Sequence, residues 1–378
     1  MVSFCLFCLL FVCYISSFSS GWSLFSPQCG YTVKDLERLR SVFNERVFGQ
    51  SVAINHLLGV LNLHKFGAES ISKPLLINFN GHSGVGKSLT SSFLKDLYLS
   101  TEQYNHFHMF VGNDYKKEKI TNNSLFSVEE TIRQAVELCE YSLFIYEDIQ
   151  SADPPFFDGL LPIFKGTKYP SKSIHIFISN LGAKVLDDLI ISSKAKRLDL
   201  NSIPKHEFKR VILSDMISQG HFIQSKEYFQ DFIPFFPIER ESAELCILAE
   251  LRNLLTSHRT QKKLSDLHLT YAGKQYLLDN LTYKKGTAFV VQGCYRVKTI
   301  VTDATSKFEE ALSQKENRFC GYYCGSYYKH QSDCLLLTTR KDTFLTPDTN
   351  KEMVTWVMDG TFGCTSINSD EDTIKIEL

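Results

Sequence analysis

The sequence has no excess of charge of either sign, no low-complexity composition and no internal repeats. Lys and Arg together number 41 and Asp and Glu 42, so there is no overall field that would gather nucleic acid or anionic lipid. Hydrophobic residues make up 43%, aromatic residues 13% and charged residues 22%, which excludes collagen, coiled coils and intrinsically disordered chains. At about 150 residues per domain, the 378 residues allow roughly two and a half domains. We therefore expect a folded protein with a sizeable core and no nucleic-acid partner.

The longest apolar run lies at the start of the chain, over residues 2–18 (VSFCLFCLLFVCYISSF), and carries no charge. Cleavage after Ser19 would place small residues, Ser17 and Ser19, at the two positions that a signal peptidase recognises. A basic segment before the run is missing, and the run is close to the lower length limit for spanning a bilayer. Residues 1–20 are therefore predicted to be a signal peptide or, alternatively, a retained hydrophobic anchor. Both interpretations place the protein in the secretory pathway.

Three further features fit the oxidising lumen of the endoplasmic reticulum (ER). Three of the eleven cysteines lie in the apolar run, and the remaining eight are an even number, so some are expected to form disulfides whose connectivity the spacing does not fix. Glycosylation sequons begin at Asn122 and Asn280, which predicts a glycoprotein. The last four residues, KIEL, resemble the ER-retrieval signal KDEL, with isoleucine at its acidic position.

Strands and helices alternate between residues 30 and 200. Apolar residues recur every three or four positions from about 30 to 72, which predicts helices. Four short apolar strands follow, with helices predicted at 88–98 and 127–140 between them; the strands are expected at 75–79, 107–111, 143–146 and 175–179. Buried strands separated by helices are typical of an α/β fold with a parallel sheet covered on both faces.

The rest of the chain divides into two parts. Residues 201–306 are predicted to form a small helical domain, with helices at 205–218 and 239–257. Residues 307–378 are expected to be an appended, turn-rich and cysteine-rich tail of unknown structure. Its four cysteines, with His330 among them, can form disulfides, hold zinc at an uncommon spacing, or belong to an unstructured extension; they are Cys320, Cys324, Cys334 and Cys364.

A phosphate-binding loop is the most specific signal in the sequence. Residues 81–88 (GHSGVGKS) match the pattern G-x-x-x-x-G-K-[ST] and lie between a predicted strand and a predicted helix. In such a loop the backbone N–H groups converge on phosphates, Lys87 reaches the β and γ phosphates, and the Ser88 hydroxyl binds magnesium. A chance glycine turn is the alternative. The sequence therefore predicts ATP and Mg²⁺ as cofactors, bound by Gly81, His82, Ser83, Gly84, Val85, Gly86, Lys87 and Ser88.

Polar residues directly follow the ends of two further predicted strands. Glu147 and Asp148 follow the strand at 143–146, where a carboxylate can hold magnesium and a second one can position the attacking water. Asn180 follows the strand at 175–179, where an amide can bridge that water and the γ-phosphate. The alternatives are two solvated acids at a strand end and, for Asn180, a helix N-cap. We predict Glu147, Asp148 and Asn180 as catalytic residues and Ser88 and Glu147 as metal ligands.

Together these motifs resemble the torsins, AAA+ ATPases of the ER lumen and nuclear envelope that are related to the Clp disaggregases. Residues 46–53 (RVFGQSVA) are similar to the segment before the family's ATPase core, and their Phe-Gly-Gln would lie near the adenine. Residues 177–183 (FISNLGA) are similar to its sensor-1 strand, residues 232–240 (FIPFFPIER) to the start of its lid, and Gly293-Cys294 to its sensor-2 motif. The resemblance covers roughly residues 30–305, with the motifs in the family's order.

The sequence also departs from the torsin pattern. Ser88 stands where torsins usually carry asparagine, and the order of Glu147 and Asp148 inverts the family's Asp-Glu. Tyr295 replaces the sensor-2 lysine, so Arg296 beside it is expected to contact phosphate instead. A displacement of catalytic groups by about 1 Å can cost on the order of 100-fold in rate, so hydrolysis is expected to be weakened by the inversion.

The resemblance has consequences for cysteines and partners. The family's redox-sensitive cysteine pair corresponds to Cys246 and Cys294, for which two buried apolar cysteines are the alternative. Torsins lack an arginine finger, which implies a membrane-anchored luminal activator that donates one, as well as protein clients, association with membranes and homo-oligomers. The implied function is ATP-driven remodelling of proteins or membranes in the ER lumen and nuclear envelope. The alternative is an ATP-binding switch or scaffold with little hydrolysis, whereas the helical domain disfavours a small-molecule kinase.

Overall fold

The structure is a computed structural model that describes residues 33–66, 73–98, 106–119, 124–165, 171–224, 226–260, 266–313, 334–345, 352–362 and 373–375. The predicted signal peptide or anchor, the sequon at Asn122, three of the four tail cysteines (Cys320, Cys324 and Cys364) and the last three residues of KIEL lie outside the described residues. Within the described ranges, no helix is both long and apolar enough to cross a bilayer.

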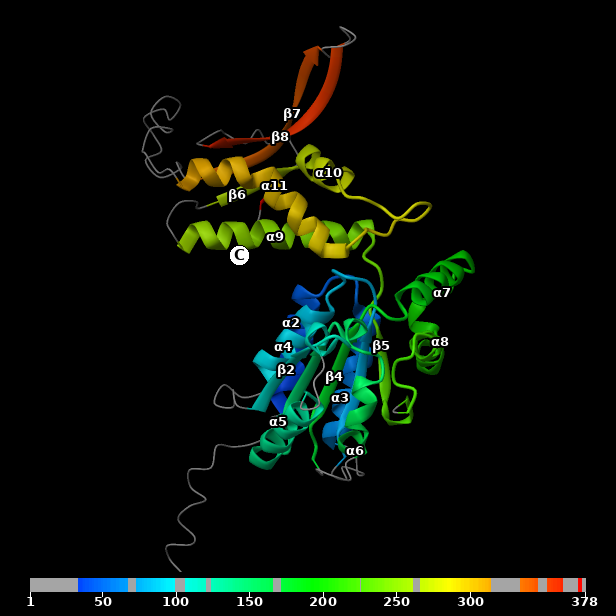
Figure 1. The fold of residues 1–378 in the computed structure, drawn as a ribbon. Helices are drawn as coiled ribbons and strands as arrows, with labels where there is room; N and C mark the ends of the chain where they lie inside the picture. Colours follow the sequence, from blue (N-terminus) through cyan, green and yellow to red (C-terminus); the bar gives the residue numbers. More distant parts are fainter. Residues whose placement is uncertain are drawn as a thin grey trace, which may run out of the picture.

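A parallel sheet forms the centre of the first part of the molecule (Figure 1). Its strand order is β2-β3-β4-β1-β5, and every neighbouring pair is parallel. The strands are β1 (Leu75–Asn80), β2 (Phe107–Val111), β3 (Leu143–Glu147), β4 (Ile174–Ser179) and β5 (Asp231–Pro234). The first four agree within one residue at each end with the sequence prediction. This agreement follows because β1 and β4 are buried along their whole length, and such strands are continuous apolar runs.

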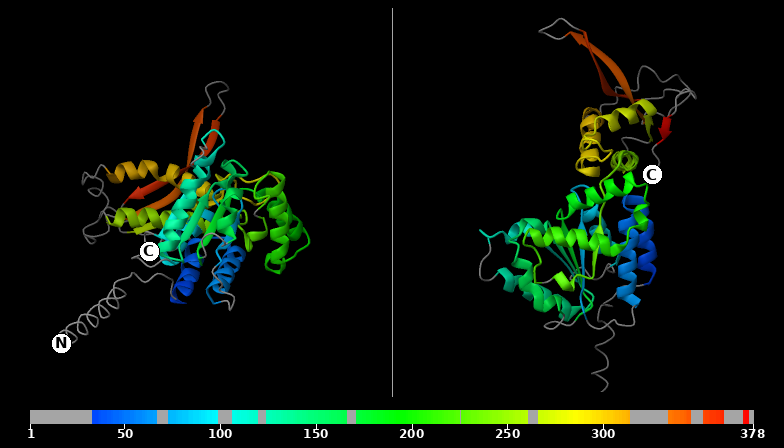
Figure 2. Two further views of the ribbon diagram at one scale, coloured as in Figure 1. Left: turned by 60° about the horizontal axis from the view of Figure 1, so that its bottom comes forward. Right: turned by 90° about the vertical axis from the view of Figure 1, so that its right-hand side faces the viewer.

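Helices cover both faces of this sheet, as predicted (Figure 2). Side chains alternate along each strand, so Ile77 and Phe79 face one layer of helices while Leu76 faces the other. The first layer is α2 (Val33–Arg46), α3 (Ser51–Phe66) and α4 (Lys87–Tyr98). The second layer is α5 (Ser124–Leu138), α6 (Leu161–Phe164), α7 (Ala183–Ala195) and α8 (Lys205–Ser218), with short 3-10 turns at Gly112–Tyr115, Ile149–Ser151, Phe156–Leu160, Leu200–Ser202 and Lys226–Tyr228.

The second face is rich in aromatic rings and contains a buried polar chain. Tyr146 stacks on Phe177 with ring centroids 4.4 Å apart. The Tyr146 hydroxyl is 2.9 Å from Nδ1 of His175, and Nε2 of that ring is 3.0 Å from the Ser173 hydroxyl. Burial lowers the pKa of His175 to about 3, so the ring is neutral at physiological pH and both nitrogens have partners.

The boundary expected at residue 201 falls inside this α/β part. Strand β5 pairs with β1, and α8 buries Phe208, Ile212 and Met216 on the aromatic face. The prediction was wrong here because β5 has only four residues and ends in proline, which makes it a weak strand signal. The helical part begins after β5, at α9 (Arg240–Thr260), and continues with α10 (Tyr271–Asp279) and α11 (Gly293–Ser313), which runs past the expected end at 306.

The second part is not purely helical, and the tail is not only turns. Strand β6 (Asp266–Thr270) joins β7 (Cys334–Leu345), β8 (Glu352–Phe362) and β9 (Thr373–Lys375) in the order β8-β7-β6-β9. The pair β6–β7 is parallel and the other two pairs are antiparallel. These strands lie beside α9, α10 and α11 at the top of Figure 1. Two buried leucines of β6, Leu267 and Leu269, tie the sheet to the main core.

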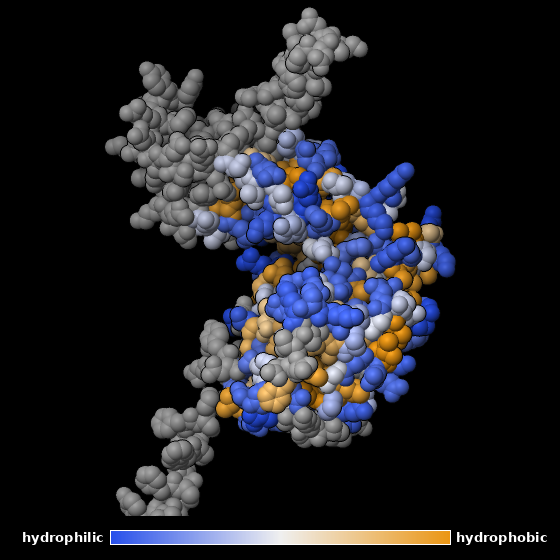
Figure 3. Space-filling view, viewed as in Figure 1, coloured by the Kyte–Doolittle hydropathy of each residue, from blue (hydrophilic) through white to orange (hydrophobic). Residues whose placement is uncertain are grey.

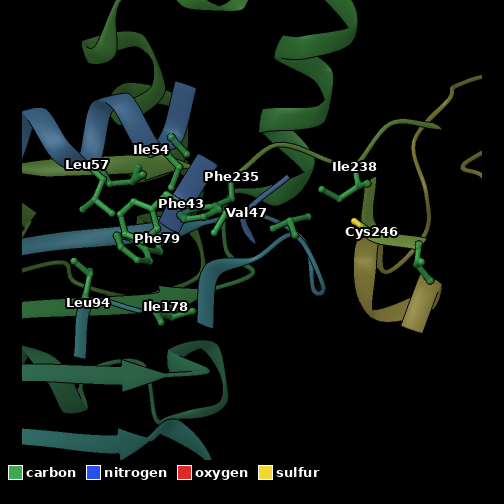
Figure 4. Packing of buried hydrophobic residues seen from close by; sticks show 14 of the residues in the cluster. Phe43, Val47, Ile54, Leu57, Phe79, Leu94, Ile178, Phe235, Ile238 and Cys246 are labelled. Atoms are coloured by element: carbon green, nitrogen blue, oxygen red, sulfur yellow. The ribbon is translucent and has the colours of Figure 1, made fainter. Parts of the chain in front are cut away.

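The core continues from the sheet to the start of the helical part (Figure 4). Phe79 of β1 packs against Phe235, with ring centroids 5.1 Å apart. Ile238 and Cys246 belong to the same buried cluster, at the end nearest the helical part. The chain between β5 and α9 is therefore a packed connection between the two parts, which we call the hinge.

Candidate nucleotide-binding site

The phosphate-binding loop lies at the carboxyl end of β1 and leads into α4, whose first residue is Lys87. Gly84 and Gly86 have φ angles of 78° and 104°, which side-chain-bearing residues rarely adopt. A Cβ on Gly84 would lie 1.8 Å from the Gln292 carbonyl oxygen of the helical part. Both glycines therefore serve the turn, and Gly84 also allows the close approach of the second part of the chain.

Lys87 is buried in this loop, with a relative exposure of 6%. Its Nζ donates to the carbonyls of Gly81 and His82, both at 2.6 Å, and to Oδ1 of Asn180 at 3.1 Å. Burial lowers the pKa of Lys87 to about 8, against the opposing effect of the nearby Glu147 and Asp148 carboxylates. A phosphate bound in the loop would replace these two carbonyls as the hydrogen-bond partner of the ammonium.

The acidic pair lies at the end of β3, and its first member contacts the loop. The Ser88 hydroxyl donates to Oε2 of Glu147 at 3.0 Å. Burial raises the pKa of Glu147, while the Ser88 hydrogen bond and the Lys87 charge oppose that rise. Hydroxyl and carboxylate oxygens are the ligands that Mg²⁺ prefers, together with phosphate oxygens. Ser88 and Glu147 therefore fit a magnesium ion bound along with a nucleotide.

Asp148 has a different environment from Glu147. Its backbone is left-handed, with φ 55°, and its two carboxylate oxygens accept hydrogen bonds from Gln150 Nε2 and, at 2.8 Å, from the Ser151 hydroxyl. Gln150 in turn accepts the Asn180 backbone N–H at 3.2 Å. The sequence analysis did not predict a role for Gln150 in the site. The only signal in the sequence is its position two residues after the acidic pair.

Strand order explains why Asn180 reaches both groups. Strand β4 lies between β1 and β3, so the residue after β4 falls between the phosphate-binding loop and the acidic pair. Besides accepting from Lys87, the Asn180 amide donates to the Ser83 hydroxyl at 3.1 Å. The structure thus brings together the predicted residues Lys87, Ser88, Glu147 and Asn180 and, at the edge of the group, Asp148.

A cavity of about 880 Å³ opens over these residues, a size that suits a nucleotide. The surface is indented between the α/β part and the helical part (Figure 3). The cavity is lined from the sheet side by residues 83–88 of the loop, the acidic pair and Asn180, whereas the predicted residues Gly81 and His82 are not among its lining residues. From α2 and the turn after it, the lining residues include Val42, Arg46 and Phe48. The helical part adds Cys246, Ala249, Glu250, Asn253, Cys294, Tyr295 and Lys298.

The Phe-Gly-Gln segment divides between two roles. Phe48 lines the cavity, as expected for a residue near the adenine. Gln50 does not line it: its side-chain amide donates to the Phe236 carbonyl and accepts the Phe236 N–H, both at 2.8 Å. Gln50 therefore secures the hinge.

Arg296, the cation expected from the torsin resemblance, is not among the residues that line the cavity, so its contact with phosphate stays a prediction. The sensor-2 motif opens a helix, α11, and residues three and four apart share one face of a helix. Tyr295 and Lys298 line the cavity together with Cys294, whereas Arg296 is not among its lining residues. The lysine at position 298 was missed because it lies outside the motif.

A backbone hydrogen bond joins the helical part to the loop region, and a disulfide joins two helices within the helical part. The Cys294 N–H donates to the Gly84 carbonyl at 3.0 Å. Cys246 of α9 and Cys294 of α11 form a disulfide, with an S–S distance of 2.00 Å. The pairing implied by the torsin resemblance is thus present, in the wall of the cavity.

The fold and the site define the class. A phosphate-binding loop, an acidic strand end and a polar strand end on a parallel sheet, with a helical part over the nucleotide site, are those of an AAA+ ATPase. In agreement, the structure is similar to that of the Saccharomyces cerevisiae Hsp104–ADP complex, with a TM-score of 0.51 and 15% identity over 75% of this chain and 48% of that chain. The chain therefore spans about half of the Hsp104 chain, and the similarity shows the fold.

Within this class, the resemblance to the torsin family is confirmed. The family model described as Torsin matches residues 23–146. The chain is 25% identical over 229 residues to a Drosophila melanogaster torsin-like protein, covering 57% of this chain and 67% of that protein. It is 23% identical over 283 residues to a Caenorhabditis elegans torsin-like protein, covering 71% and 76%, and 22% identical over 232 residues to mouse Torsin-3A, covering 56% and 59%.

Proposed function

We propose that this protein binds ATP with magnesium and hydrolyses it slowly, as a torsin-like remodelling ATPase. The observation that carries the proposal is the convergence of Lys87, Ser88, Glu147 and Asn180 on one cavity. Lys87 would contact the β and γ phosphates, and Ser88 and Glu147 would hold magnesium, which neutralises phosphate charge when bound. Asn180 would orient the attacking water beside the γ-phosphate.

Asp148 would be the residue that positions or deprotonates that water, and its surroundings support slow hydrolysis. Both of its carboxylate oxygens are occupied by Gln150 and Ser151, so the carboxylate has to leave these donors before it can accept a proton from water. This same observation favours the second candidate function, an ATP-binding switch that hydrolyses little.

The helical part would act as the lid, with Lys298 supplying the cation that we first expected from Arg296. Lys298 lines the cavity one helical turn after Cys294, so it can reach the phosphates of a bound nucleotide when the lid is closed. The Cys246–Cys294 disulfide, which holds two lid helices at the same wall, would make the position of Lys298 depend on redox state.

We further propose that the protein works in the ER lumen and nuclear envelope on protein or membrane clients. The apolar run over residues 2–18 and the disulfide support this compartment. An activator anchored in the membrane would donate an arginine to the site, which is typically worth roughly 10³ to 10⁵ in rate. Self-association, which is usual among AAA+ proteins, would precede or accompany that contact.

Single-turnover hydrolysis, measured with and without candidate luminal activators, tests the proposal. The expected result is tight ATP binding, slow cleavage alone and faster cleavage with an activator. Exchanging the acidic pair (Glu147→Asp with Asp148→Glu) should raise turnover if the inversion causes the slow rate. ATP that binds but is never cleaved under any of these conditions would support the switch, and failure to bind ATP would reject both functions.

A further inference from the structure

A buried carboxylate joins the phosphate-binding loop to the lid. Asp187 lies on α7 and is 1% exposed. Its Oδ2 accepts hydrogen bonds from Nε2 of His82 at 2.8 Å and from Nζ of Lys284 at 2.7 Å. His82 belongs to the loop, and Lys284 belongs to the turn between α10 and α11. We call His82, Asp187 and Lys284 the Asp187 clasp.

The charges of the clasp hold it together in spite of its burial. Burial alone would raise the pKa of Asp187, but the hydrogen bonds and charges of His82 and Lys284 outweigh it, and the pKa lies below its ordinary value. Oδ1 of Asp187 is buried without a hydrogen-bond partner among the described residues. The carboxylate therefore depends on the hydrogen bonds from His82 and Lys284 and on the charge of Lys284, and losing Lys284 leaves a poorly compensated buried charge.

A second set of contacts shows that α7 docks on the hinge of the lid. Lys194, two turns further along α7, forms an ion pair with Glu239 and lies 5.7 Å from the centre of the Phe289 ring. Glu239 and Phe289 form a β-bridge to each other, so this one helix contacts both the hinge and the segment that pairs with it. Helix α7 thus contacts the nucleotide loop at one end and the segments next to the lid helices at the other.

We propose that Asp187 is a positioning residue that couples occupancy of the phosphate-binding loop to closure of the lid. The coupling rests on the proposed function, because it requires that ATP binds at the loop. Neither Asp187 nor Lys284 lines the nucleotide cavity, so an effect of Lys284 on ATP affinity that the neighbouring charge of Lys285 does not have is expected to pass through the clasp. By linkage, if ATP at the loop strengthens the clasp, then the clasp strengthens ATP binding by the same factor.

The coupling is tested by replacing Lys284 in the full chain, with Lys285 as the matched control. Lys285 is the next residue, is exposed and does not belong to the clasp. We expect Lys284→Met to weaken ATP binding at least about fivefold, the lower end of typical coupling between sites, whereas Lys285→Met stays at the wild-type value. Lys284→Arg, which keeps the charge, should restore most of the affinity. Binding is measured by titration with fluorescent ATP and magnesium.

Hydrogen exchange supplies a readout that a purely structural role would not change. The amides of Val290 and Val291 donate to the carbonyls of Ile238 and Thr282, both at 2.8 Å. ATP should slow their exchange in the wild-type protein and in Lys285→Met, but not in Lys284→Met.

The outcomes separate the two proposals. If the wild-type protein binds ATP and Lys284→Met binds it equally well, losing only thermal stability, the coupling is overturned and the proposed function stands. If the wild-type protein does not bind ATP, the proposed function fails and the coupling fails with it.

Discussion

The buried ammonium of Lys87 leads to a quantitative prediction about pH. Its pKa is lowered to about 8, so at pH 7 roughly nine molecules in ten carry the charge, and at pH 9 roughly one in ten. Only the charged form attracts a phosphate, and apparent affinity scales with the fraction of protein in the competent form. ATP affinity should therefore fall about tenfold between pH 7 and pH 9.

The same pKa shift has the opposite effect on folding stability. In the unfolded chain the lysine keeps its ordinary pKa of 10.5, so below pH 8 both states are protonated and the folded state bears the cost of a buried charge. As the pH rises above 8, the folded state releases the proton before the unfolded state does, and stability increases. The unfolding free energy contributed by Lys87 should rise by about 1 kcal/mol between pH 7 and pH 9.

Two measurements on one pair of proteins test this reasoning. Fluorescent-ATP titrations and denaturant unfolding are carried out at pH 7, 8 and 9 on the wild-type protein and on Lys87→Arg, whose guanidinium stays charged throughout. The wild-type protein should lose affinity and gain stability relative to Lys87→Arg. Parallel pH profiles for the two proteins, in either measurement, would refute the assignment of a lowered lysine pKa.

Three other perturbations have defined outcomes. Lys298→Ala should weaken ATP binding in titrations by roughly tenfold, as expected for the loss of one charged hydrogen bond, and Arg296→Ala should leave it unchanged. A loss of affinity in Arg296→Ala but not in Lys298→Ala would contradict the proposal that Lys298 is the cation of α11 that contacts phosphate. Gly112→Ala adds a Cβ 2.3 Å from the Asp148 carbonyl oxygen, so single-turnover hydrolysis should drop on the order of 100-fold while ATP affinity is kept; unchanged hydrolysis would argue against Asp148. The pKa of His175 is about 3 in the folded protein and 6.5 in the unfolded chain, so the unfolding free energy should decrease as the pH falls below 6.5, by about 2 kcal/mol at pH 5. If the unfolding free energy of His175→Gln fell equally steeply with pH, His175 would not be the origin of the loss.

The parts of the fold that the sequence predicted are those with strong local signals. Strands β1, β3 and β4 are buried and largely apolar runs, β2 is a short, largely apolar run at the edge of the sheet, and the phosphate-binding loop is fixed by its glycines and Lys87. The contact of Ser88 with Glu147 followed from the sequence as well, because the ends of parallel strands meet at one edge of a sheet.

The parts that the sequence did not predict depend on contacts between distant segments. Strand β5 is identified by its pairing with β1, and the second sheet by the pairing of β6 with strands about 70 residues or more away. The sequence favours Arg296 because it adjoins the motif, whereas the residues of α11 that line the cavity include Lys298 and not Arg296. Asp187 carried no sequence signal at all, since its two partners come from separate parts of the chain.

The most direct test of the nucleotide site is the effect of magnesium on ATP affinity in Glu147→Gln. Ser88 and Glu147 are placed to share one divalent ion with the phosphates, so magnesium should strengthen ATP binding in the wild-type protein. It should do so much less in Glu147→Gln, while affinity without magnesium stays close to the wild-type value. Glu250→Gln, which changes a carboxylate on the lid side of the same cavity, should keep the full magnesium effect. A full magnesium effect in Glu147→Gln would contradict the account.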